Sequence, residues 1–166
     1  MNFNTTIAEF PKEVKLLIGA FLIVLSVGYF TGFRFVNETT ENTPTGIQEN
    51  YLGNEDDLEA KVMKFRKPRR EMLTIIHTHI LSMSVIFFIL GGLVSFAKLP
   101  TWLKKSLMLE PLLSVLLTFG GIYLMWSGYH FMRYVVMISG ILMTTSFIIS
   151  VVIVFLQLFK RSEAEV

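Results

Sequence analysis

Four long apolar runs constrain this chain more than any other feature of its sequence. They cover roughly residues 14–33, 72–97, 106–126 and 134–159, with short polar or charged segments between them. Each run reaches the ~20 residues that an α-helix needs to cross ~30 Å of hydrocarbon. Backbone polar groups in lipid must pair within their own segment, so helices follow. The sequence predicts an all-α, four-helix transmembrane bundle, with residues 1–166 as a single integral membrane domain.

The composition excludes several kinds of chemistry. The chain is 52% hydrophobic and contains no cysteine. Disulfides, thiolate nucleophiles, Cys-ligated clusters and covalent c-type haem attachment are therefore excluded. The motifs of hydrolases, kinases, P-loop proteins and zincins are absent as well. We expect a protein that is not an enzyme by itself and serves at most as an electron-transfer subunit.

A polar loop at residues 34–71 joins the first two runs and divides into halves of opposite charge. Seven acids lie between positions 37 and 60, and six bases form a basic block between 61 and 70. Six apolar residues interrupt it, which a plain flexible linker does not need: Tyr51, Leu52, Leu58, Val62, Met63 and Phe65. We expect part of this loop to pack on the membrane surface or on a partner, with a short helix over residues 55–65.

Three histidines lie near one face of the predicted bundle. His77 and His79 come early in the second run, and His130 comes just before the fourth. The second and fourth spans start on the same side of the membrane, so all three imidazoles share that side. His77 and His79 are two residues apart, about 200° around a regular helix. At most one of the pair therefore points into the bundle.

A haem b held between helices is the functional interpretation of this cluster. Imidazole is a common axial ligand of haem iron, and facing bundle helices supply such ligands. We expect His79 and His130 to ligate the iron, with His77 as the alternative to His79 and Met83 as a substitute ligand one turn further on. Arg133 and the basic block are expected to meet the propionates.

Other interpretations of the histidines remain open. They can be structural imidazoles that hydrogen-bond at the interface, or ligands of copper or zinc, although the 200° separation opposes a metal site. A role in proton transfer during quinol oxidation is compatible with haem, because imidazole titrates near neutrality and Glu71, Tyr129 and Tyr134 lie near the same face. The rival function is a non-catalytic accessory or assembly subunit that docks a partner through residues 34–71.

Two smaller features carry expectations of their own. Glu110, beside Pro111, has two interpretations: an intramembrane carboxylate for ion coupling, or an acid at the start of the third helix, favoured by the helix dipole, with Lys104 or Lys105 as its counter-charge. We prefer the second. Gly28 and Gly32 are four residues apart, a spacing that permits close approach to a neighbouring helix.

The charges around the spans suggest location and partners. Lysine and arginine are nearly balanced between the two sides, and we expect the termini to be cytoplasmic, in a bacterial inner membrane. Expected partners are the lipid bilayer and other membrane or extracytoplasmic protein subunits. Nucleic acid is not expected, because a basic block beside a span more often contacts lipid phosphates or an acidic partner.

One stretch resembles small bacterial membrane proteins of no assigned function, in which a basic segment leads into a His-x-His helix. It consists of residues 65–73 (FRKPRREML), followed by His77-Thr78-His79 and Ser82-Met83. The likeness covers residues 51–95 and implies no activity. More distantly, the chain is similar to the His-bearing helices of four-helix b-type cytochromes. Those place ligands near both membrane faces, whereas this chain has histidines near one, so the resemblance implies one haem at most.

Overall fold

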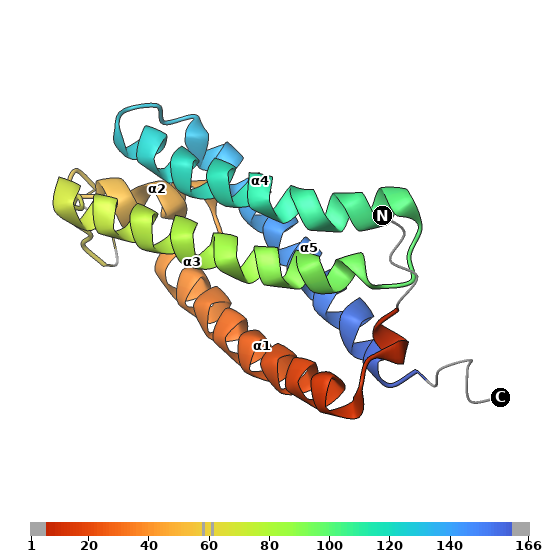
Figure 1. The fold of residues 1–166 in the computed structure, drawn as a ribbon. Helices are drawn as coiled ribbons and strands as arrows, with labels where there is room; N and C mark the ends of the chain where they lie inside the picture. The colour runs from red at the N-terminus through yellow and green to blue at the C-terminus, as the bar shows by residue number, and fades with distance from the viewer. Residues whose placement is uncertain (1–5, 58, 61, 161–166) are drawn as a thin grey trace.

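The computed structural model describes residues 6–57, 59–60 and 62–160, and within these ranges it is helical, without strands (Figure 1). A short 3-10 helix, η1 (Ile7–Glu9), precedes α1 (Lys12–Thr40), α2 (Pro44–Leu52), α3 (Arg69–Ser95), α4 (Thr101–Trp126) and α5 (Met132–Leu158). The helices α1, α3, α4 and α5 are each long and apolar enough to cross a membrane. The predicted four-helix transmembrane bundle is confirmed.

The packed part of the bundle is formed by α3, α4 and α5. The helices α3 and α4 lie side by side, α5 crosses behind them, and α1 diverges from α3 (Figure 1). Buried residues are frequent along α4, whereas α1 buries few of its own and exposes large apolar side chains such as Leu16, Val24 and Phe30. In a bilayer these side chains meet lipid, so an exposed apolar surface is expected on a membrane-spanning helix.

A tight antiparallel hairpin joins α4 to α5. Gly128 in the turn has φ of +115°, a conformation that only glycine adopts without strain. Gly121 is buried, and a Cβ on it would lie 2.9 Å from Cγ2 of Val136. A tight contact between α4 and α5 is therefore made at Gly121. Gly28 and Gly32 on α1 have no atom within 4 Å of where a Cβ would stand, so the expected close approach is not made to any described helix.

The polar connection is folded, but not as the sequence predicted. Helix α1 continues to Thr40, so the connection between spans is residues 41–68, which we call the cap. The helix of the cap is α2, which has Pro44 in its first turn. Thr43 directly precedes this helix, and its side chain accepts a hydrogen bond from the Gly46 amide at 2.9 Å. The expected helix over residues 55–65 is wrong, because the described residues there form turns, a bend and irregular chain.

Asn54 explains why no helix forms in the second half of the cap. Its backbone amide donates to the Lys64 carbonyl at 3.0 Å, and its side-chain oxygen accepts from the Lys64 amide at 2.7 Å. Its side-chain amide also donates to the Val62 carbonyl at 3.1 Å. These bonds close residues 54–64 into a loop and use backbone groups that a helix would need. The cap and the α4–α5 turn lie at one end of the bundle, the loop face, and η1 packs with α5 at the other, the termini face.

Candidate functional site

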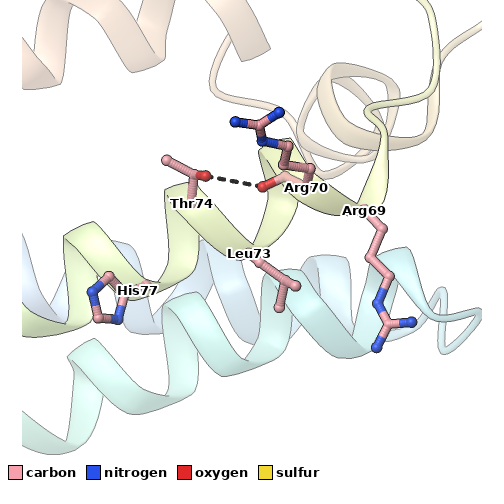
Figure 2. A pocket seen from close by; sticks show the side chains of 5 residues that line it. All are labelled: Arg69, Arg70, Leu73, Thr74 and His77. Carbon is pink, nitrogen blue, oxygen red and sulfur yellow. Dashed lines mark hydrogen bonds between the residues drawn. The ribbon is translucent and has the colours of Figure 1, made fainter.

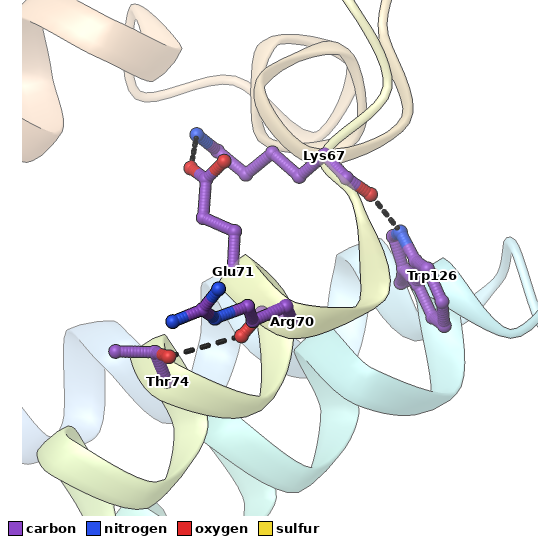
Figure 3. A network of polar contacts seen from close by, with 5 residues as sticks. All are labelled: Lys67, Arg70, Glu71, Thr74 and Trp126. Carbon is purple, nitrogen blue, oxygen red and sulfur yellow. Dashed lines mark hydrogen bonds and ion pairs between the residues drawn. The ribbon is translucent and has the colours of Figure 1, made fainter.

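The cap is fastened to the end of α4 through Trp126. The indole Nε1 of Trp126 donates to the Lys67 carbonyl at 2.9 Å, and the guanidinium of Arg66 donates to the Trp126 carbonyl at 3.0 Å. Arg66 also lies over the indole ring, 5.1 Å from its centroid. Lys67 pairs with Glu71, which lies in the first turn of α3, at 2.5 Å (Figure 3). Three members of the basic block thus make specific side-chain contacts inside the protein: Arg66, Lys67 and Lys64, whose Nζ donates to the Thr39 carbonyl.

Arg133, predicted to meet a haem propionate, connects α5 to α2. Its Nη1 donates to Oε1 of Gln48 at 2.9 Å, and its Nη2 donates to the Tyr134 hydroxyl at 3.2 Å. The buried Nε of Arg133 has no hydrogen-bond partner among the described residues. One donor of this guanidinium is therefore buried and unpaired in the described structure.

His79 points from α3 toward α4. Its ring stacks on Phe119, with centroids 4.8 Å apart, and its Nδ1 lies 2.7 Å from the Ile75 carbonyl oxygen. A carbonyl oxygen only accepts, so Nδ1 carries the proton and donates it. Nε2 is left as the nitrogen with a free lone pair.

His77 points to the outer surface of the same helix. It lines a shallow, open hollow together with Arg69, Arg70, Leu73 and Thr74 (Figure 2). The expectation that the helix turn separates His77 from His79 is confirmed, since only His79 stacks on a neighbouring span.

The structure does not join His130 to the other two histidines. His130 lies in the turn after α4, whereas Phe119, which stacks on His79, lies seven residues before the end of that helix, about 10 Å along its axis. No hydrogen bond or ring contact links any two histidines, each of which lies in the described ranges. Met83 is half-buried on α3, one turn beyond His79. No group of three or more His, Cys, Asp or Glu residues suited to a metal ion occurs in the described part of the chain.

Glu110 forms a polar cluster that the sequence interpretation missed. Its two carboxylate oxygens accept hydrogen bonds from Ser114 of its own helix, at 2.5 Å, and from Ser146 of α5. The expected role as a helix-start acid is wrong, because α4 begins at Thr101 and Glu110 lies two and a half turns inside it. Neither lysine forms an ion pair with it in the described structure, and Lys104 instead donates to the Ser95 carbonyl at 2.9 Å.

A signal for this cluster was present in the sequence. Glu110, Ser114 and Thr118 follow at intervals of four, which places them on one helix face. Thr118 and Ser139 are buried and share a hydrogen bond of 2.7 Å across the α4–α5 contact. What the sequence left open was the partner on α5, because Ser146 is one of several hydroxyl residues on that helix.

Residues 41–165 match the model of a protein family described as a transmembrane helical domain. The chain belongs to this family. The match covers the cap, α3, α4 and α5, and so contains the three histidines, Arg133 and Glu110. No curated protein and no solved structure matches the chain. The transmembrane helical domain is thus the established property of this protein, and its long helices lie in contact with lipid.

Proposed function

We propose that this protein is an accessory or assembly subunit of a membrane complex and that its cap is the docking surface for a partner. The observation that carries the proposal is a group of apolar side chains on an otherwise fixed cap. Val62, Met63 and Phe65 are 66%, 50% and 70% exposed, although the chain around them is held by hydrogen bonds of Asn54, Lys64 and Arg66. A linker without a partner has no use for such a surface.

The apolar group lies outside the hydrocarbon. Lys64, which stands between Met63 and Phe65, donates from its Nζ to the Thr39 carbonyl at 2.9 Å. Arg34 is the first charged residue after the apolar part of α1. Thr39 is five residues further along the helix, a distance of about 8 Å along its axis. The headgroup layer is about 5–8 Å thick on each side. The distance of the apolar group from the hydrocarbon favours a protein over lipid as its binding partner.

Charges near the apolar group define the chemistry of the partner. Glu55, Asp56, Asp57 and Glu59 are exposed in the same half of the cap. Carboxylates repel anionic lipid headgroups and attract a basic protein surface. We therefore propose a partner with an apolar patch rimmed by Lys and Arg. With the termini in the cytoplasm of a bacterial cell, that partner is an extracytoplasmic protein or domain.

A photo-crosslinking amino acid placed in the cap tests the proposal in cells. At position 65 we expect one discrete protein adduct, with the same partner recovered from positions 62 and 63. Phe30 of α1 is the matched control, because it is a comparably exposed phenylalanine (61%) within the apolar part of a membrane-spanning helix and should give no such adduct. Replacing Asp56 and Asp57 with lysine should abolish the adduct. The proposal would be contradicted if the probe forms adducts with lipid alone, or if it forms no protein adduct at any of the three positions.

The second candidate is haem b binding, favoured by the ring geometry of His79. A haem-ligating histidine characteristically donates its other ring N–H to a carbonyl or carboxylate, which fixes the tautomer. The Nδ1 contact of His79 with Ile75 fulfils this condition and leaves Nε2 for iron. His79 thus fits as one axial ligand, and His130 remains the proposed second. The iron would supply one-electron transfer.

Absorption spectroscopy of the purified protein incubated with haem tests this second candidate. We expect a reduced-minus-oxidised b-type spectrum that His79→Ala abolishes and His130→Ala shifts. His77→Ala should leave the spectrum unchanged, because that ring faces the outer hollow. A folded protein that takes up no haem contradicts this candidate and leaves the accessory role standing.

A further inference from the structure

Glu110 is a carboxyl group inside the membrane-spanning part of the bundle. It lies nine residues into α4, about 14 Å along the axis, and five residues beyond Lys105. Its partner Ser146 stands near the middle of α5, thirteen residues after Arg133 and fourteen before Lys160. The carboxyl and its two serines therefore lie within the hydrocarbon layer.

No basic group offsets a negative charge at this position. The facing segments are residues 16–33 of α1, 80–95 of α3 and 134–158 of α5, all within the described ranges, and they contain no Asp, Glu, Lys, Arg or His. In the described part of the chain, Tyr29 of α1 interacts electrostatically with Glu110, and its hydroxyl hydrogen-bonds Thr144 at 3.2 Å. Lys104 is engaged with Ser95. An unpaired carboxylate in hydrocarbon is costly, and such residues normally mark a functional site.

We propose that Glu110, with Ser114 and Ser146, forms a proton-binding site within the membrane. The carboxyl takes a proton from water at the membrane interface and returns it there. In the ionised state both serine hydroxyls donate to the carboxylate. In the protonated state the carboxyl O–H donates to one serine, whose own hydrogen turns to a backbone carbonyl of its helix. A hydroxyl both donates and accepts, so the same three residues satisfy both states.

The contacts favour a proton over a metal ion. Ser114 and Ser146 bond directly to different carboxylate oxygens. The cluster therefore offers three side chains in mutual contact, whereas hard cations such as Ca²⁺ and Mg²⁺ take about six or more oxygen ligands around an open centre.

Helix adhesion alone does not require an acid here. About two turns from Glu110 along the same contact, Thr118 and Ser139 join α4 to α5 with neutral hydroxyls. A second hydroxyl or an amide at position 110 would give the same adhesion without the cost of a charge in hydrocarbon. Unlike a hydroxyl or an amide, a carboxyl group at position 110 can also bind and release a proton.

Carbodiimide labelling of the full chain in liposomes tests this site. N,N′-dicyclohexylcarbodiimide reacts with protonated carboxyls in apolar surroundings. We expect labelling at Glu110 that falls as the pH rises, and none at Glu71 or Glu38, which lie outside the hydrocarbon. Infrared difference spectra between acidic and alkaline buffer should show a carboxylic C=O band that is lost in Glu110→Gln.

The glutamine variant also separates proton binding from adhesion. Its amide preserves hydrogen bonds to both serines, so we expect a folded protein without the label or the band. Ser146→Ala should shift the pH at which labelling declines, whereas Thr145→Ala should not, because Thr145 bonds only to the Ile141 carbonyl of its own helix. A folded wild-type protein with neither label nor band overturns the proposal, as does a Glu110→Gln variant that retains the band.

Discussion

The guanidinium of Arg66 lies 5.1 Å from the ring centroid of Trp126 and donates to the carbonyl of the same residue at 3.0 Å. These residues are sixty positions apart, and their contact closes the cap over the end of α4. The indole N–H returns a hydrogen bond to the neighbouring Lys67 carbonyl. One tryptophan thus fixes two consecutive cap residues.

Arg66→Ala should loosen the second half of the cap without unfolding the bundle. An exposed cation–π contact contributes about 0.5–1 kcal/mol and a hydrogen bond about 1 kcal/mol. We expect amide hydrogen exchange at residues 62–67 to accelerate about tenfold, which corresponds to about 1.4 kcal/mol. Arg69→Ala is the control, because Arg69 is exposed and its side chain makes no hydrogen bond in the described structure. Equal exchange in the two variants would show that the Trp126 contact does not hold the cap.

The contact of Gly121 with Val136 sets the spacing of α4 and α5. In Gly121→Ala the new methyl would stand 2.9 Å from Cγ2 of Val136, a buried side chain with a stiff χ1. Overpacking of this kind costs about 1–3 kcal/mol. We expect a lower melting temperature in detergent, partly restored by adding Val136→Ala.

The neighbouring glycine provides the control for this substitution. A Cβ at Gly120 meets no atom within 4 Å, and alanine is the better helix former. Gly120→Ala should therefore melt at or slightly above the wild-type temperature. A decrease as large as that of Gly121→Ala would contradict the assignment of the tight contact to Gly121.

The sequence predicted the spans well and their polar ends poorly. Hydropathy reports where hydrocarbon-compatible residues lie, so the four spans were evident. Backbone hydrogen bonds continue beyond the apolar residues, however, and α4 begins five residues before its predicted start, at Thr101. That error made Glu110 look like a helix-start acid, when it lies well inside the span.

The contacts that shape the loop face depend on residues far apart in the sequence. Lys64 bonds to Thr39 across 25 positions, and Arg133 bonds to Gln48 across 85. Nothing local in the sequence encodes such pairs. The separation of His77 from His79, by contrast, follows from helix geometry alone and was predictable. The haem ligands and the docking role of the cap stay predictions.

The hydrogen bond between Arg133 and Gln48 should hold α2 against α5. A hydrogen bond to a charged group contributes about 1.5–3 kcal/mol, and partial exposure places this one near the lower end. Gln48→Ala and Arg133→Ala should each speed hydrogen exchange in residues 44–52. In a double-mutant cycle the second substitution should add little to the first. Fully additive effects would show that the two side chains act independently.

Tyr51 should make the cap sensitive to alkali. Burial raises the pKa of its hydroxyl above the ordinary 10.0, outweighing the hydrogen bond with Asn50, which lowers it. Above pH 10 the unfolded cap loses this proton while the folded cap retains it, so the folded state binds more protons and its stability falls as pH rises. Below pH 10 both states hold the proton, and this group adds no pH dependence.

Tyr51→Phe tests that sign. It keeps the packed ring and removes the ionisable group, so the alkaline acceleration of hydrogen exchange in residues 44–54 should diminish. Tyr129→Phe is the control, because Tyr129 is exposed in the α4–α5 turn and lies outside the cap. After correction for the intrinsic pH dependence of exchange, an undiminished acceleration in Tyr51→Phe would assign the alkaline opening to a group other than Tyr51.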